Sequence, residues 1–294
     1  MREWTWVTFL LKCILENNYF EFNGKYYKQI IGCAMGSTVS PEVSDIRMFQ
    51  ITQSIMAQFQ YANKVLFHGR FRDDGFIIFN GSENEILDFF QIGNQCHPHL
   101  KFTFEISIDS VNFLDTTVYK GRKFQESNKL DIKSYIKPTN NFQYLHRESS
   151  HNPAVFKGFI KGECIRHMRN TNDTATLSTI LQNFKKHLSK RGYSDTEIDP
   201  IITGVTGTDR NKMLNKNNSE SKLRNPLVMI TKYNPRIKGL KKRILKYWNE
   251  MKTDTRCKEI FTSEPVVAYS KHKSIGDMII RSRLPQEYTA KVDP

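Results

Sequence analysis

The 294-residue sequence has few cysteines, and they lack the spacing of a zinc site or a disulfide framework. The five cysteines are odd in number and include no C-x-x-C pair. The chain also lacks a run of about 18 apolar residues, so we expect no membrane span. No apolar segment with a small-residue cleavage site opens the sequence, so secretion is not expected. A reducing, intracellular compartment fits this composition best.

Acidic residues are scarce relative to basic ones beyond the first third of the chain. Residues 1–100 carry 8 basic and 10 acidic side chains, whereas residues 101–294 carry 36 basic and 20 acidic ones. The net charge is +14 at pH 7. Such an excess favours a polyanionic partner through counterion release, although a solvated lysine-rich surface has the same balance. The 38% hydrophobic content indicates a folded protein of one large or two ordinary domains.

The hydrophobic pattern of residues 1–137 predicts an α+β fold. Asn23-Gly24 is the turn signal of a hairpin, Ser40 and Pro41 are expected as N-cap and first residue of a long helix, and Ser82-x-x-Glu85 is a capping box. We expect helices over 4–16, 40–58 and 82–90, and strands over 19–22, 26–30, 65–71, 75–79, 102–106, 111–119 and 130–136.

Residues 138–294 are expected to be mainly helical. Helices are predicted over 154–169 and 174–190, the latter closed by Gly192, and a short one follows the capping box Ser194-x-x-Glu197. The Asn- and Ser-rich segment 207–225 is expected to be a flexible linker. Beyond it we expect a strand near 227–230, a basic helix over 238–251 and a last helix near 274–281.

Two neighbouring carboxylates, Asp73 and Asp74, are the most distinctive chemical feature. They fall between two predicted strands, where a turn releases them from the alternation of faces along a strand. Two carboxylates on a hairpin suit a pair of magnesium ions about 3.5–4 Å apart, as in phosphoryl transfer. The other interpretation is an ordinary Asp-Asp-Gly turn, in which Gly75 supplies a positive φ. The hairpin alone leaves both open.

A loop of small residues precedes the long helix. In Gly36-Ser37-x-x-Ser40-Pro41 only Val39 is bulky, so the backbone can approach a flat or charged ligand. Taken singly, the loop is interpreted as a well-capped start of a helix.

Loop, long helix, Asp-Asp hairpin, helix and later strand follow one another in an order that resembles the palm of reverse transcriptases. The sequences of the motifs are most similar to those of the Penelope-like retroelement branch, which is related to telomerase. The similar segments lie along nearly the whole chain, at 17–24 (NNYFEFNG), 32–37 (GCAMGS), 70–74 (RFRDD), 97–104 (HPHLKFTF), 113–119 (FLDTTVY), 137–140 (KPTN), 151–153 (HNP), 159–163 (FIKGE) and 265–269 (PVVAY).

The resemblance implies roles for particular residues. Asp73 and Asp74 would be the catalytic pair that binds Mg²⁺ and the primer 3′ end, with Phe71 where many relatives have Tyr. Lys101 would lie on a strand near the nucleotide's phosphates, although a solvated edge lysine is an equal alternative. The remaining implied residues are a loop at the templating base and incoming nucleotide (Ala34, Met35, Gly36, Ser37 and Ser40) and a primer grip (Phe113, Leu114 and Asp115), for which simple strand packing is the alternative.

The sequence departs from the family in one respect that affects activity. Reverse transcriptases take a further metal-binding Asp from a strand before the small-residue loop, but the first Asp here is Asp45. The fingers and a downstream Gly-Ile-Tyr nuclease module are also not recognisable. We therefore expect an N-terminally truncated polymerase fragment with weakened Mg²⁺ binding that does not polymerise by itself.

The resemblance divides the chain into a partial palm (1–137), a helical thumb-like subdomain (138–206), the linker (207–225) and a basic extension (226–294). RNA template and DNA primer would be the partners; no obligate protein partner is evident. Basic residues at helical spacings would follow a phosphate backbone or form a solvated face: Lys157, Lys161, Arg166, Arg169, Lys185, Lys186, Lys190, Arg191, Lys238, Lys241, Lys242, Arg243 and Lys246.

We also have expectations for two aromatic residues, three histidines and one basic cluster. Tyr233 and Trp248 are candidates for stacking on bases, although core packing is favoured for Trp248. His146, His151 and His167 lack metal-ligand spacing, so surface or core roles are expected for them. A nuclear location would rest only on Lys241-Lys242-Arg243, so location stays open.

Two alternatives to the polymerase fragment remain. One is a non-catalytic nucleic-acid-binding protein, either a decayed or a co-opted copy of the element. The other is a structural α+β protein whose basic surface has no function.

Overall fold

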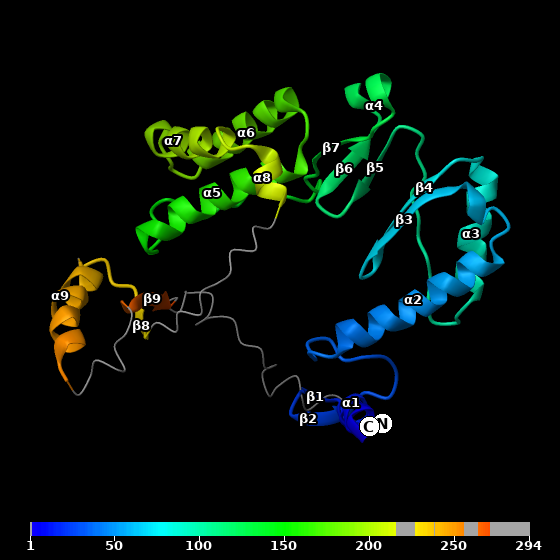
Figure 1. The fold of residues 1–294 in the computed structure, drawn as a ribbon, viewed down its shortest axis with the longest axis horizontal. Coiled ribbons are helices and arrows are strands. Elements are labelled where there is room, and N and C mark those ends of the chain that lie inside the picture. The colour runs from blue at the N-terminus through cyan, green and yellow to red at the C-terminus, as the bar shows by residue number, and fades with distance from the viewer. Residues whose placement is uncertain (1, 216–226, 238, 256–263, 271–294) are drawn as a thin grey trace. The chain divides into compact units, whose positions relative to one another are not determined.

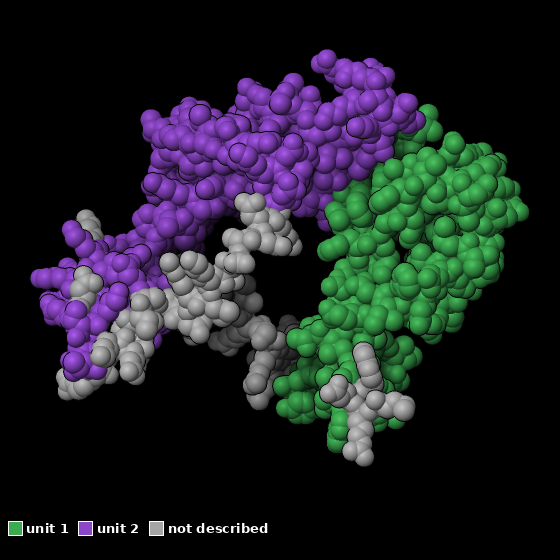
Figure 2. All heavy atoms as spheres, viewed as in Figure 1, with its two compact units in different colours: residues 1–114, 280–294 green, residues 115–279 purple. Residues whose placement is uncertain are grey.

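The computed structural model describes residues 2–215, 227–237, 239–255 and 264–270, and these form a mixed α+β structure (Figure 1). The expected fold class is therefore confirmed at this level. The chain divides into two compact units at residue 114, coloured separately in Figure 2. The four divisions drawn from the polymerase resemblance stay predictions.

The N-terminal segment of the first unit is a helix followed by a hairpin, as expected. Helix α1 (Arg2–Glu16) precedes β1 (Tyr19–Phe22) and β2 (Lys25–Lys28), which pair antiparallel across the Asn23-Gly24 turn. Both turn residues have positive φ, 54° and 74°, as this type of turn requires. Phe20 stacks on Tyr27 with centroids 5.5 Å apart, yet both strands are exposed throughout.

The core of the first unit lies between two helices and a hairpin. Helices α2 (Ser40–Gln58) and α3 (Glu83–Gln95) and strands β3 (Val65–Phe71) and β4 (Asp74–Phe79) enclose it, and the 3-10 turn η1 (Ala62–Lys64) leads into β3. The capping box at the start of α3 is confirmed, since the Glu85 backbone N–H donates to the Ser82 hydroxyl and the Ser82 N–H donates to the Glu85 carboxylate at 2.9 Å. The buried side chains are Ile51, Ile55, Phe59, Ile86 and Phe89.

The expected N-cap Ser40 is wrong by one position. Val39 already has helical dihedrals, and its carbonyl accepts the Val43 N–H at 3.1 Å, so Ser40 is the first residue inside α2. The preceding loop is the cause, because the Ser40 N–H is turned back to the Ser37 carbonyl and the chain coils before the helix begins.

Two predicted strands are also wrong. Residues 102–106 form no strand, because the Phe102 N–H and carbonyl both bond to the Asn94 side chain and not to a neighbouring strand. The strand expected over 111–119 is two strands, β5 (Ser110–Phe113) and β6 (Thr116–Tyr119). Leu114 separates them because its φ of +53° is incompatible with an extended strand.

The second unit packs a short sheet segment against helices. Strand β6 pairs antiparallel with β7 (Asp131–Ser134), and the short helix α4 (Arg122–Ser127), which the sequence did not indicate, connects them. Helices α5 (Pro153–Asn170), α6 (Thr174–Ser189) and α7 (Asp195–Thr206) match the predicted positions, and Gly192 after α6 has a φ of +87°. They share one core, of which Ile160, Cys164, Leu188 and Ile198 are the most deeply buried side chains.

Part of the expected linker is a helix. Helix α8 (Arg210–Leu214) packs against α5, because the Arg210 guanidinium donates to the carbonyls of Met168 and Arg169 at 3.1 and 2.7 Å. Its Asp209 side chain caps it by accepting the Asn211 N–H at 3.0 Å. Residues 216–225 of the expected linker lie outside the described ranges.

The last described segment joins two parallel strands through a helix. Strand β8 (Val228–Lys232) pairs with β9 (Val266–Ser270), and helix α9 (Leu240–Thr253) lies between them in the chain. The predicted strand and basic helix are confirmed, whereas β9 was not expected. The helix predicted near 274–281 lies outside the described residues.

Candidate nucleic-acid interface and carboxylate hairpin

Asp73 and Asp74 lie at the tip of the β3–β4 hairpin. Phe71 pairs with Asp74, so Arg72 and Asp73 alone form the turn. Arg72 has a φ of +56°, and both carboxylates are exposed to solvent, as is Phe71. The predicted hairpin is thereby confirmed, with the two acids at its solvent-facing end.

Asp45 of α2 holds this tip. Its carboxylate accepts hydrogen bonds from Arg70 at 2.8 Å and from Arg72 at 2.5 Å, and its carbonyl accepts a second bond from Arg70 at 3.0 Å. Asp45 is five residues beyond Ser40, or about 7.5 Å along the helix. The hairpin tip is therefore tied to the same end of α2 as the small-residue loop. No sequence signal indicated this contact.

The small-residue loop leads directly into α2. Met35 is fully exposed, and Gly36 has a φ of +92° with open space where a side chain would be. Ser40 is only 7% exposed, and its Oγ has no hydrogen-bond partner within the part of the chain that is described. A buried hydroxyl without a partner normally costs free energy, so this position suits a polar group supplied by a ligand or water.

The other predicted site residues are placed as follows. Lys101 is exposed on an irregular segment after α3, not on a strand. Phe113 ends β5 and packs against Phe76 of the Asp-Asp hairpin, with ring centroids 5.5 Å apart. Leu114 is exposed at the turn, and Asp115 forms an ion pair of 3.5 Å with Arg166. Of the residues implied as the primer grip, Phe113 thus contacts the hairpin that carries Asp73 and Asp74.

A complete metal site is not present among the described residues. No group of three or more Asp, Glu, His or Cys side chains with metal-binding geometry occurs in them. The hairpin therefore offers a pair of carboxylates, which is fewer ligands than a two-metal centre uses.

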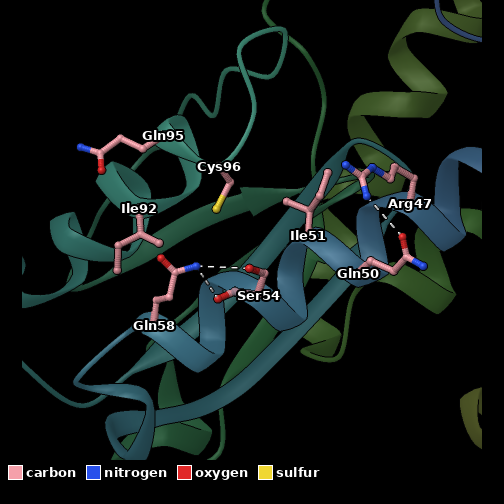
Figure 3. Close-up of a pocket in the computed structure, with 8 residues that line it drawn as sticks. All are labelled: Arg47, Gln50, Ile51, Ser54, Gln58, Ile92, Gln95 and Cys96. Atoms are coloured by element: carbon pink, nitrogen blue, oxygen red, sulfur yellow. Dashed lines mark hydrogen bonds between the residues drawn. The ribbon is translucent and has the colours of Figure 1, made fainter.

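A polar groove of about 460 Å³ lies between α2 and α3 (Figure 3). Gln58 crosses part of it, donating to the Ser54 carbonyl at 3.1 Å, and Ile51 and Ile92 form its apolar wall. None of the predicted site residues lines this groove, so it is separate from the carboxylate hairpin.

In the second unit, α5 and α6 form a helix-turn-helix with a turn of three residues, 171–173. Strand β7 fixes this turn: Asn172 donates to the Asp131 carboxylate at 2.9 Å and accepts the Ile132 N–H at 3.1 Å. Thr171 accepts the Ser134 N–H at 3.1 Å. The direction in which α6 leaves the turn is therefore set by hydrogen bonds to β7, of which the bond to Thr171 is buried. The motif was not predicted from the sequence, although the three-residue interval and Asp173 as an N-cap would have indicated it.

A buried histidine strengthens the same junction. His167 is 1% exposed and shares a 3.1 Å hydrogen bond with the Ser134 hydroxyl. Burial lowers the pKa of His167, and Arg166 lowers it further. The imidazole is therefore neutral at pH 7. His146 and His151 take part in local turn hydrogen bonds, so the expectation of surface or core roles for the three histidines agrees with their positions.

Some basic residues of the second unit form ion pairs or hydrogen bonds within the protein, and others do not. Lys185 is paired with Asp195 and Asp199 at 3.2 and 2.7 Å, and Arg166 with Glu163 at 2.8 Å. The Arg169 and Arg191 guanidiniums donate to the carbonyls of Met213 and Tyr144. Four lysines are exposed and have no ion pair within the described ranges: Lys157, Lys161, Lys186 and Lys190.

The basic helix α9 carries exposed cations, and the aromatic residues Tyr233 and Trp248 belong to the same part of the chain. Lys241, Lys242, Arg243 and Lys246 are exposed, whereas Lys238 lies outside the described residues. Trp248 is 4% exposed, which agrees with the core role expected for it. Tyr233 makes an edge-on contact with Tyr269, with ring centroids 5.6 Å apart.

Comparison with known proteins gives one match. Residues 143–203 match the family model of the animal helix-turn-helix domain. This segment includes α5, the turn, α6 and most of α7. The match indicates nucleic-acid binding by the second unit. It covers a minority of the chain and says nothing about reverse transcription. No curated protein and no solved structure matches the chain.

A search of the described helices for one long and apolar enough to cross a bilayer found none.

Proposed function

We propose that this chain is a nucleic-acid-binding part of a retroelement reverse transcriptase of the Penelope-like branch, with the RNA/DNA hybrid as its partner. The observation that carries the proposal is the helix-turn-helix unit, whose turn is fixed by β7 and whose exposed lysines are unpaired within the described residues. Cations free to meet phosphates are what counterion release requires.

The first unit supports the polymerase side of the proposal. Asp73 and Asp74 are exposed at a hairpin tip that Asp45 ties to the start of α2. The unpartnered, buried Ser40 hydroxyl lies at that same end. Two carboxylates at a hairpin tip, together with a hydroxyl that has no hydrogen-bond partner, suit the binding of a nucleotide with Mg²⁺. A further carboxylate from outside the described residues is needed for a complete two-metal centre.

The binding test uses the full chain and a fluorescent 20-base-pair RNA/DNA hybrid, titrated by anisotropy between 50 and 200 mM salt. We expect binding that weakens steeply with salt. Asp73→Asn should leave it unchanged, because the unpaired lysines that carry the binding belong to the second unit. No measurable binding at 50 mM salt would overturn the proposal and favour a structural protein with a basic surface.

A second test measures metal binding directly and does not depend on polymerase activity. Mn²⁺ binding, followed by electron paramagnetic resonance, is expected to be weak and to be lost in Asp73→Asn/Asp74→Asn. It should be retained in Asp109→Asn, which alters an exposed carboxylate elsewhere in the first unit. Primer extension with Mg²⁺ is expected to be absent; robust extension that Asp73→Ala abolishes would refute the incomplete-centre interpretation.

A second candidate function is a non-catalytic binding protein of the same descent. The lack of a three-ligand metal group within the described ranges favours it. It predicts hybrid binding with Mn²⁺ affinity that is the same in the wild type and in Asp73→Asn/Asp74→Asn.

A further inference from the structure

The polar groove of about 460 Å³ between α2 and α3 runs along one face of α2 (Figure 3). Its lining residues on that helix recur at helical spacing, so they share a face: Arg47, Gln50, Ile51, Ser54 and Gln58. Arg47 and Gln58 end this row and lie about 16 Å apart along the helix axis. A volume of this size spread over that length makes a narrow, elongated site.

The groove has a single charged lining residue, the cation Arg47 at one end. The Arg47 guanidinium donates to the Gln50 side-chain oxygen at 3.4 Å and has no carboxylate partner among the described residues. An anionic group can therefore bind at this end without displacing an ion pair formed within those residues. A guanidinium binds a carboxylate through two parallel hydrogen bonds, so a carboxylate is the anion that we expect there.

The other polar groups of the groove are side-chain amides and a hydroxyl. Gln58 Nε2 donates to the carbonyl and the hydroxyl of Ser54 at 3.1 and 3.2 Å, which leaves the Gln58 Oε1 without a donor in the described part of the chain. The Gln95 amide, contributed by α3, has no hydrogen-bond partner there either. Side-chain amides both donate and accept hydrogen bonds, so they can pair with the N–H and C=O groups of a peptide backbone.

The floor of the groove is apolar and closely packed. Ile51 of α2 is 5% exposed, and Ile92 of α3 is partly buried. Where the two helices meet, a Cβ added to Gly93 would lie 3.4 Å from Cδ1 of Ile55, which is ordinary van der Waals contact. A ligand therefore lies over the two helices and does not enter between them. One apolar side chain of such a ligand can cover Ile51 and Ile92.

From these observations we infer that the groove binds the C-terminus of a partner protein as an extended peptide, with its terminal carboxylate on Arg47 and its backbone bonded to Gln58 and Gln95. The cation lies at one end of the row, so the anion belongs at the end of the peptide. An extended chain covers about 3.3–3.6 Å per residue, so the groove holds about five residues. A nucleic-acid strand matches the groove less well, because it carries a negative charge at every nucleotide and the lining has one cation. This protein-binding site goes beyond the nucleic-acid binding proposed above and does not depend on it.

The test probes the full chain against two arrays of randomised five-residue peptides, identical except that one ends in free carboxylates and the other in amides. The peptide that binds most tightly is then made in both forms, and the affinities are measured by fluorescence anisotropy. We expect the carboxylate form to bind about three- to tenfold more tightly than the amide form. Arg47→Gln should abolish this difference. Gln95→Ala should weaken the binding of both forms and leave the difference between them unchanged, which a general loss of fold would not do.

Cys96 reports occupancy of the groove directly. Its thiol is free and lines the groove, and the free, partly exposed Cys33 of the small-residue loop is an internal control. The selected peptide should slow the alkylation of Cys96 by iodoacetamide, measured by mass spectrometry, and leave the alkylation of Cys33 unchanged. Gln53→Ala in α2 and Lys25→Gln in β2 alter exposed residues that do not line the groove, so these variants should bind the peptide as the wild type does. All variants are compared by circular dichroism melting.

Three results would contradict the inference. One is that no peptide of either array binds to the full chain. Another is that the selected peptide binds without protecting Cys96, or that Arg47→Gln retains the preference for the carboxylate form. The third is that a single-stranded oligonucleotide protects Cys96 and the peptides do not, which would assign the groove to nucleic acid.

Discussion

The buried His167 makes the stability of the second unit depend on pH. Its pKa is lowered, first by burial and then by Arg166, from the ordinary value of 6.5. In the unfolded chain the imidazole therefore takes up a proton near pH 6.5, whereas in the folded protein it does so only at lower pH. The unfolded state binds more protons in this interval, so the free energy of unfolding decreases as the pH falls below 6.5.

The change in the free energy of unfolding is limited by the uptake of a single proton. The free energy of unfolding should fall by at most about 1.4 kcal/mol per pH unit between pH 6.5 and the folded-state pKa. Urea unfolding followed by circular dichroism between pH 8 and 5 measures it. His167→Gln keeps a polar group beside Ser134 but does not titrate, so its unfolding free energy should lack this component.

Comparing the wild type with His167→Gln cancels the pH dependence that other titrating groups contribute to both proteins. His68 and His187 also have lowered pKa values, chiefly through burial, and both are present in the two proteins. Identical pH dependence of the wild type and His167→Gln over this range would refute the assignment of a neutral, buried imidazole.

Three further substitutions test the packing, the helix and the hairpin. Leu188→Ala, at a fully buried position, should lower the free energy of unfolding by about 2–5 kcal/mol in guanidinium titrations, and a loss similar to that of the exposed Ser189→Ala would contradict the core described here. Gly158→Ala should raise it by about 0.5–1 kcal/mol, because an added Cβ meets open space, and a decrease would show that the glycine is required. Asp45→Ala should speed amide exchange in residues 70–75 roughly two- to tenfold, whereas equal exchange in Glu42→Ala and Asp45→Ala would exclude the tie between α2 and the hairpin.

Local sequence signals predicted the elements whose bonding is local. The Asn23-Gly24 turn, the Ser82 capping box and the Gly192 helix end involve residues within a few positions of one another, and all three are confirmed. The Asp-Asp hairpin was predicted for the same reason. Hydrophobic periodicity and turn residues report on neighbours in the sequence, and the hydrogen bonds of these elements also join residues close together in the sequence.

The failures occurred where distant residues decide the structure. Residues 102–106 have the alternation of a strand, but the Asn94 side chain takes the hydrogen bonds of Phe102. The linker prediction failed because Arg210 bonds to α5 from 41 and 42 positions away. The contact of Asp45 with Arg70 spans 25 positions, and no pattern along the chain reports such a pairing.

The parallel pairing of β8 with β9 has a consequence for synthesis. Two parallel strands cannot close through a tight turn, so β8 stays unpaired until the chain through Ser270 has been made. At about 5–20 residues per second this takes about 2–8 s after Val228 is added. During that time the segment Val228-Met229-Ile230 is an apolar strand with open hydrogen-bonding edges, a target for chaperones and for misassembly with another nascent chain.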